Sequence, residues 1–227
     1  MQTISIGIQN NCAACECSCK YCLLQSDKKA GGVDYYRGKR LAERFAQWMK
    51  TSETLLPIYY YIGYCAEYPE LFDNIHFNKT WGFVGGDFLQ CNGIKIRNEA
   101  ETKELILRLK AAGIAMIDTT FFGTKEYHDQ FAARQGDFEF LLRLSKCAVS
   151  EGIVCAPTFV ICEENKGMLS DLFDILTEIT GPKMYSFLQD YRGRGYLLEN
   201  SRLKIESYEK LPEKIKNTFN KVRYKTE

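Results

Sequence analysis

The sequence predicts an α/β protein with a parallel sheet, because β-branched and aromatic runs alternate with segments whose apolar residues recur at helical spacing. We interpret six runs as strands: residues 3–9, 57–63, 80–84, 114–120, 153–161 and 183–188. Strands separated by helices pair in parallel through right-handed crossovers. Such architectures place their chemistry on loops at the carboxyl ends of the strands, and five of the ten cysteines follow the first strand, at positions 12 to 22.

The composition of each run justifies its assignment as a strand. Residues 3–9 alternate Ile with small or polar residues, and residues 57–63 are rich in Tyr and Ile. Residues 80–84 are aromatic and β-branched and end at Gly85-Gly86-Asp87. Pro157 lies inside the fifth run, so we expect an irregular ladder there.

Helices are predicted between these strands. Leu105, Ile106 and Leu109 mark one face of residues 101–112, and Asp137 has the position of an N-cap whose helix runs to Gly152. The other predicted helical segments are residues 36–50, a short helical or irregular piece at 70–75, and residues 169–179 and 212–222.

The composition favours one globular domain over residues 1–227, with residues 189–227 as a C-terminal loop and helix extension, although length alone leaves two small domains open. The formal net charge of +1 gives no field that would attract nucleic acid or an anionic membrane. No apolar run approaches the roughly 20 residues that span a bilayer. Only two histidines are present, which excludes a histidine-rich metal site. We expect a cytoplasmic, oxygen-sensitive protein.

The spacing of Cys15, Cys19 and Cys22 is C-x3-C-x2-C. Three thiolates on one short loop can each bind one corner of an iron–sulfur cube, whereas a structural zinc takes four ligands. The fourth iron then keeps open positions for a small molecule. A zinc knuckle that adds Cys12 remains an alternative, and a disulfide framework is disfavoured because the other cysteines are scattered. Cys12 and Cys17 stay unassigned within the loop.

This motif, with the aromatic Tyr21 before its last cysteine, resembles that of the radical SAM superfamily. The resemblance implies an open, TIM-like partial (β/α)6 barrel. It also implies that Cys15, Cys19 and Cys22 hold a [4Fe-4S] cluster whose open iron binds S-adenosyl-L-methionine. Reductive cleavage would then give a 5′-deoxyadenosyl radical that abstracts hydrogen from a peptide or small-molecule substrate. An electron donor such as flavodoxin or ferredoxin is implied as a partner.

The resemblance implies two candidate sites for the methionyl amino group of this cofactor. Gly85-Gly86-Asp87 is closer in letters to the family's Gly-Gly-Glu stretch, but it follows the third predicted strand. Gly63 to Glu67 follows the second strand, where the family carries the motif, so position favours Glu67. Thr119 and Thr120, at the end of the fourth strand, are candidates for contacting cofactor hydroxyls.

Two further segments carry candidate residues. Residues 121–144, which include His128-Asp129, resemble stretches of radical SAM enzymes that act on peptides; the alternative is a hydrogen-bonded helix start without chemistry. Arg192 and Arg194 follow the last strand and suit a carboxylate or phosphate, or a solvated turn.

Three functions therefore remain open. The first is a radical SAM enzyme acting on a peptide or small molecule, and the second is a glycyl-radical activating enzyme. The third is a non-catalytic zinc or iron–sulfur binding module. Because no cysteine follows Cys162, the C-terminal third lacks ligands for auxiliary clusters.

Overall fold

The computed structural model describes residues 6–9, 15–20, 22, 34–51, 58–61, 67, 69–83, 87–182, 185–188 and 200–218. Strands and helices alternate along these residues, as predicted. The strands are β1 (Ile6–Gln9), β2 (Ile58–Tyr61), β3 (Phe88–Gln90), β4 (Met116–Phe121), β5 (Val154–Ile161) and β6 (Tyr185–Leu188). The helices are α1 (Tyr35–Thr51), α2 (Leu71–Trp81), α3 (Glu99–Ala111), α4 (Lys125–Ala132), α5 (Asp137–Ser150), the 3₁₀ turn η2 (Lys166–Met168), α6 (Leu169–Thr180), α7 (Ile205–Glu209) and α8 (Glu213–Lys216).

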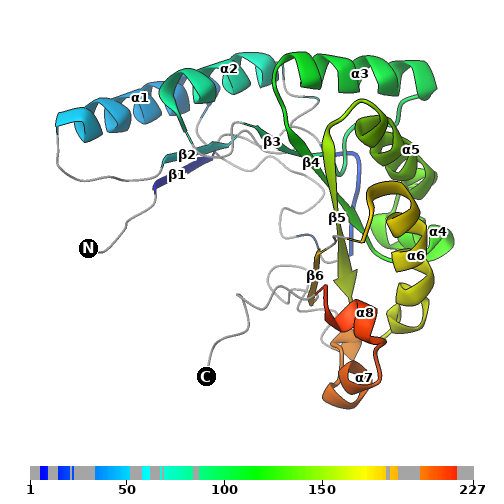
Figure 1. Ribbon diagram of the computed structural model, residues 1–227. Helices are drawn as coiled ribbons and strands as arrows, with labels where there is room; N and C mark the ends of the chain where they lie inside the picture. Colours follow the sequence, from blue (N-terminus) through cyan, green and yellow to red (C-terminus); the bar gives the residue numbers. More distant parts are fainter. Residues whose placement is uncertain are drawn as a thin grey trace.

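All described strand pairs are parallel. β1 pairs with β2, and β3, β4, β5 and β6 form a second sheet in that order. Figure 1 shows the strands along the inside of a curved arrangement, with helices α1 to α6 along its outside. The predicted parallel α/β fold is therefore confirmed. None of the described helices has the length and apolar character needed to cross a membrane.

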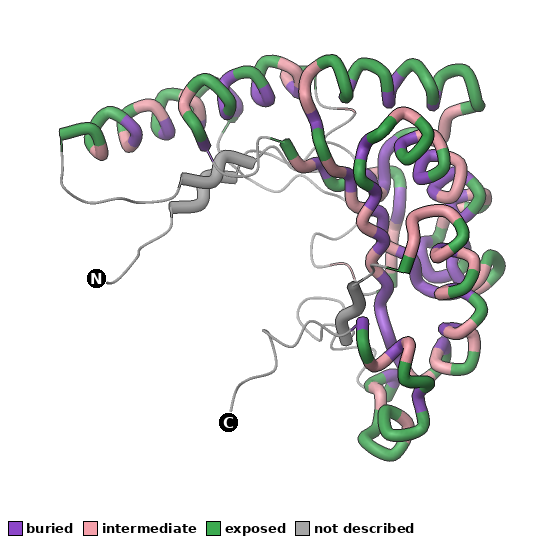
Figure 2. Tube along the Cα trace, in the orientation of Figure 1, coloured by how far each residue is buried: buried purple, intermediate pink, exposed green. Residues whose placement is uncertain are grey.

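The two faces of β4 have different surroundings. Ile117, Thr119 and Phe121 are buried, and Ile117 and Phe121 belong to the main core with Leu141 and Leu144 of α5. Side chains alternate along a strand, so Asp118 and Thr120 point the other way, toward the inside of the curve, and both are half-buried. Figure 2 shows this alternation of buried and intermediate residues along the central strands.

The predicted third strand, residues 80–84, is wrong. Helix α2 continues through Trp81 and stops at Gly82, whose φ of 66° is left-handed, and the third strand is β3. The predicted helical or irregular piece at 70–75 is the start of this helix, and its continuation was missed because its buried face, at positions 71, 74, 75 and 78, includes two asparagines. Asn78 donates a side-chain hydrogen bond to Asn74 at 3.3 Å, and these two polar residues occupy buried positions of the helix.

Other local predictions also need correction. Asp137 is the first residue of α5, and its N-cap is Gly136. The ladder between β4 and β5 is continuous through Pro157, whereas the ladder between β5 and β6 starts only at Thr158. Within the expected helix 212–222, the described residues form only the single turn α8, and positions 219–222 lie outside the described residues.

Candidate functional site

The cysteine loop is held at the carboxyl side of the sheet by backbone hydrogen bonds. Three loop amides donate to carbonyls of other segments: Glu16 to Gly93 at 2.8 Å, Ser18 to Ala132 at 2.9 Å and Lys20 to Phe131 at 3.1 Å. Gly93 lies three residues beyond β3, and the other two acceptors form the last turn of α4, which follows β4. The loop therefore contacts the segments that follow β3 and β4, as the strand-end prediction requires.

The three motif cysteines are half-buried. Cys15 and Cys19 pack against an apolar cluster that includes Phe122 and Phe131, and the Cys22 amide donates to the Cys19 carbonyl at 3.0 Å. No disulfide joins the described cysteines. Tyr21 lies outside the described residues.

Cys15, Cys19 and Cys22 offer three thiolates, and an iron–sulfur cube binds each thiolate at a different iron. A tetrahedral structural zinc takes four ligands. Cys12, which the zinc alternative requires, lies outside the described residues.

The lack of a side chain at Gly93 leaves room for the side chain of Cys15. A Cβ at position 93 would lie 2.0 Å from the Cys15 sulfur, and the φ of Gly93 is 72°. Any side chain here therefore displaces Cys15 as well as straining the backbone.

We expect Gly93→Ala to lose at least half of the iron that the wild-type protein binds after anaerobic reconstitution, because Cys15 must move. Gly152→Ala is the matched control, since Gly152 has a similar φ of 82° and open space around its Cβ position. Equal iron in both variants would contradict the predicted clash. The measurement is iron per chain, with the apoprotein's thermal midpoint as a check on folding.

Beneath the loop lies a buried pair, His128 and Asp137, whose side chains are both 0% exposed. The Phe122 amide donates to His128 Nδ1 at 3.2 Å, so the ring proton sits on Nε2, which donates to Asp137 Oδ2 at 3.0 Å. Burial alone would raise the pKa of Asp137, but the His128 hydrogen bond and the Arg134 charge outweigh it and lower that pKa. Asp137 is thus held as a carboxylate.

The sequence analysis offered a hydrogen-bonded helix start as one interpretation of His128-Asp129, but both residues lie in the middle of α4. Both residues are buried in α4. The Asp129 carboxylate accepts the amides of Gly136 at 2.7 Å and Phe138 at 2.9 Å, so it caps the next helix, α5. The pair therefore joins α4 to α5.

The structure places the two candidate carboxylates near opposite ends of β3. Glu67 follows β2, and its Oε1 accepts the Lys95 amide at 2.9 Å and the Arg97 guanidinium at 2.7 Å, both from the segment after β3. Asp87 is exposed and precedes β3; its backbone carbonyl accepts the amides of Ala115 and Met116 at the start of β4. Gly63, Gly85 and Gly86 lie outside the described residues, as do Arg192 and Arg194.

Polar side chains that the sequence analysis did not single out lie on the inner face of β3, β4 and β5. Thr158 donates to Asp118 Oδ1 at 2.8 Å. Burial raises the pKa of Asp118, and hydrogen bonds from Thr158, Gln90 and the Thr119 amide offset this only in part. The period-2 pattern of the fourth strand was the available signal, because it puts Asp118 on the same face as Thr120.

The two threonines of β4 differ. Thr119 is 0% exposed, and its hydroxyl lies 3.4 Å from Ser145 of α5, so it faces the core and is not available to a cofactor. Thr120 faces inward, and its backbone is bonded by the side chain of Asn92: the Thr120 amide donates to Asn92 Oδ1 at 2.6 Å, and Asn92 Nδ2 donates to the Thr120 carbonyl at 2.8 Å.

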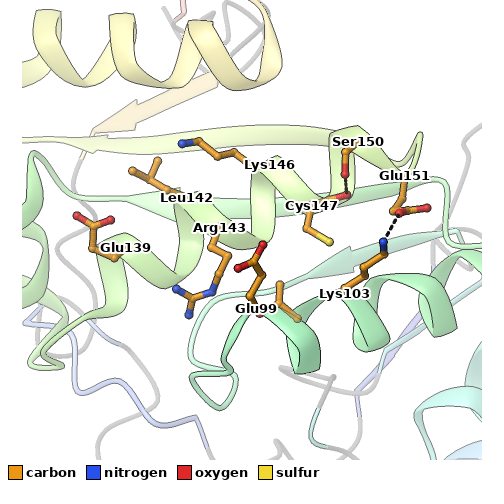
Figure 3. A pocket seen from close by; sticks show the side chains of 10 residues that line it. Glu99, Lys103, Glu139, Leu142, Arg143, Lys146, Cys147, Ser150 and Glu151 are labelled. Atoms are coloured by element: carbon orange, nitrogen blue, oxygen red, sulfur yellow. Dashed lines mark hydrogen bonds and ion pairs between the residues drawn. The ribbon is translucent and has the colours of Figure 1, made fainter.

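A groove of about 570 Å³ lies between α3 and α5 on the outside of the fold (Figure 3). Its charged lining residues balance in sign: Lys103, Arg143 and Lys146 against Glu99, Glu139 and Glu151. Lys103 pairs with Glu151 at 4.0 Å. This groove lies on the helix side of the sheet, whereas Asp118 and Thr120 face the inner side.

Known proteins share this fold. A curated relative, the Fe-coproporphyrin III synthase of Methanosarcina barkeri, is 29% identical over 104 residues, which cover 46% of this chain and 26% of the relative. The structure of anSMEcpe with bound AdoMet gives a TM-score of 0.63 at 15% identity, covering 91% of this chain and 55% of that one. No protein-family profile matches the chain.

Two other solved structures extend the comparison. SuiB of Streptococcus suis bound to S-adenosylmethionine gives a TM-score of 0.59 at 11% identity, covering 83% of this chain and 41% of that one. Coproporphyrinogen III oxidase (HemN) of Escherichia coli, a radical SAM enzyme, gives 0.57 at 11% identity, covering 91% and 48%. The chain thus spans about a quarter of the curated relative and about half of each solved protein. The chain therefore shares its fold with these solved proteins, one of which is a radical SAM enzyme, as the predicted parallel β/α architecture implies.

Proposed function

Because this chain has the fold of a radical SAM enzyme and a C-x3-C-x2-C loop beside the ends of its parallel strands, we propose that it is itself a radical SAM enzyme. Its cofactors are a [4Fe-4S] cluster, held by Cys15, Cys19 and Cys22, and S-adenosyl-L-methionine. The position of the cysteine loop is the observation that carries the proposal. Residues 1–227 act as one core domain, with residues 189–227 as its extension.

A [4Fe-4S] cluster held by Cys15, Cys19 and Cys22 would supply one-electron reduction: with an electron from a donor such as flavodoxin or ferredoxin, the sulfonium of S-adenosyl-L-methionine would be cleaved to methionine and a 5′-deoxyadenosyl radical. The chain's own residues orient the reactants. Glu67 and the segment from Gly63 suit the methionyl amino group, because a carboxylate accepts a charge-assisted hydrogen bond from it. Thr120 is proposed as a contact of the cofactor, and Tyr21 flanks the third ligand.

The substrate is proposed to be a peptide or a small molecule that enters the concave side of the sheet. Asp118 and Thr158 face that side and offer hydrogen-bonding groups there. Two similar structures hold peptides: SuiB bound to the precursor peptide SuiA, and anSMEcpe bound to the Cp18Cys peptide. They support a peptide as the first substrate class to test.

The test is the metal content of anaerobically reconstituted protein, together with 5′-deoxyadenosine formation after addition of S-adenosylmethionine and dithionite. About four irons and four sulfides per chain, with deoxyadenosine formed, are expected. One tightly bound zinc without cofactor cleavage would instead identify a structural module and overturn the proposal. Iron with no cleavage under strong reduction would leave an iron–sulfur binding module and overturn it equally.

A separate prediction distinguishes the two carboxylate candidates. We expect Glu67→Gln to weaken S-adenosylmethionine binding about tenfold or more, because a hydrogen bond between charged groups contributes about 1.5–3 kcal/mol. Asp87→Asn is the matched control and should leave affinity unchanged, since Asp87 precedes β3 at the far end of the sheet. Equilibrium dialysis with the reconstituted protein measures both, and a larger effect of Asp87→Asn would reverse the assignment.

A further inference from the structure

Asp137 joins four segments beneath the cysteine loop. Its Oδ2 accepts the His128 Nε2 proton at 3.0 Å and the thiol of Cys17 at 3.6 Å. Its Oδ1 accepts Arg134 Nε at 3.1 Å and also a terminal nitrogen of the same guanidinium. The carboxylate therefore ties the start of α5 to α4, to the turn between them, and to a loop residue 120 positions earlier in the chain.

Arg134 extends this connection to two more points. Its Nη1 donates to Glu16 Oε2 at 3.1 Å and to the Ile94 carbonyl at 2.6 Å. The Arg134 side chain is 8% exposed, so these bonds form largely out of water, whereas Glu16 is 47% exposed. One guanidinium thus bridges Asp137, the cysteine loop and the segment after Gly93, a use of the planar fork that lysine cannot reproduce.

The contacts are made in the spacer of the C-x3-C motif. Glu16 and Cys17 lie between the ligands Cys15 and Cys19, and each is held by a side chain from the α4–α5 region. Cys17 is 3% exposed and packs with Phe122, Phe131 and Val160. Its thiol donates to Asp137 and is also hydrogen-bonded with the side chains of Cys15 and Cys19, so Asp137 holds it beside the two proposed ligands.

We propose that Arg134 and Asp137 are positioning residues that clamp this spacer, so that the loop presents Cys15 and Cys19 as ligands and keeps Cys17 out of the ligand set. The clamp rests on the proposed function, because positioning matters only if the loop binds a cluster. It explains how a loop that carries an additional cysteine, Cys17, between its first two ligands still offers Cys15, Cys19 and Cys22 to a cluster. The backbone hydrogen bonds of the loop fix its position, and the clamp fixes which of its side chains are presented to a cluster.

The first experiment compares Arg134→Gln, Arg134→Lys and Glu16→Gln with the control Glu139→Gln. The control breaks an exposed ion pair between α4 and α5, in which Lys125 and Glu139 lie 3.1 Å apart. The readout is the rate of iron loss to a chelator from reconstituted protein. Residues that orient metal ligands typically change affinity 10–100-fold, so about tenfold faster loss is expected for both Arg134 variants. Glu16→Gln should give a smaller acceleration, and Glu139→Gln none.

A second readout separates positioning from plain destabilisation. In the apoprotein, hydrogen exchange of the Ser18 and Lys20 amides should accelerate in Arg134→Gln while the amides of β4 and β5 keep their protection. Exchange that rises equally everywhere would mean that Arg134 only stabilises the fold, and the clamp would be rejected. Because Glu16 is exposed and its change cannot unfold the core, unchanged iron loss and unchanged loop exchange in Glu16→Gln would also count against the clamp.

Cys17→Ala tests the ligand assignment. We expect this variant to bind about four irons per chain, as the wild type does, and to retain the change in the electron paramagnetic resonance spectrum on adding S-adenosylmethionine. Loss of iron in Cys17→Ala would show that Cys17 is a ligand and overturn the inference. If the wild-type protein binds no iron at all, the proposed function fails, and loop exchange in the apoprotein still decides whether the clamp exists.

Discussion

Replacing Cys19 by alanine is expected to abolish formation of 5′-deoxyadenosine and to lower bound iron well below the wild-type value. Cys19 is the middle one of the three proposed ligands, and two remaining thiolates cannot hold three irons of a cube. Its half-buried side chain packs at the edge of a small apolar cluster, so the truncation removes little of the core.

The matched control is Cys147→Ala. Cys147 is also a half-buried thiol without a disulfide, but it lies on α5 in the outer groove of Figure 3. This variant should keep full iron content and full cofactor cleavage. Comparable iron and activity in the two variants would remove Cys19 from the ligand set.

The largest expected change in stability follows Asp137→Asn. This substitution leaves the buried Arg134 and His128 without their carboxylate, and breaking a buried ion pair in this way costs about 3–5 kcal/mol. Urea denaturation of the apoprotein measures the free energy of unfolding. Asp174→Asn, which breaks the exposed pair of Asp174 and Lys214 at 2.6 Å, should change it by about 0–1 kcal/mol. Similar losses in the two variants would contradict the importance of burial.

The same carboxylate predicts a pH dependence. The folded-state pKa of Asp137 is lowered, so its contribution to stability is complete above the pKa of an unfolded aspartate, about 3.9, and is lost as pH falls through the lower folded value. The stability difference between wild type and Asp137→Asn should therefore be constant near neutral pH and shrink below about pH 4. A difference that grows in acid would mean that the group is not held as a carboxylate.

Local patterns predicted much of the fold and part of the site. Five of the six strands overlap the predicted runs, because their β-branched and aromatic residues are contiguous or alternate with small and polar ones. The third strand failed because Asn74 and Asn78 occupy buried helix positions, which no hydrophobic pattern reports. Spacing alone predicted the cysteine triplet as candidate ligands, since all three residues lie on one short loop.

Local sequence patterns could not predict the clamp. Its members come from the cysteine loop and from α4 and α5, more than a hundred positions apart, and periodicity gives no distance between segments. The same holds for Gly93, whose need for glycine arises from the Cys15 sulfur beside it rather than from a turn motif.

Asn92 has a consequence for how the sheet ends. Its amide group bonds both the amide and the carbonyl of Thr120, the two backbone groups that a longer β3 would have bonded through two of its residues. The chain after β3 can therefore leave the sheet at Asn92, two residues beyond Gln90, while the Thr120 backbone of β4 keeps its hydrogen bonds. That early departure lets the chain reach Gly93, where its carbonyl receives the cysteine loop. The Asn92 side chain thus lets the chain that leaves β3 bind the cysteine loop, and Asn92→Leu would remove both of its hydrogen bonds to the Thr120 backbone.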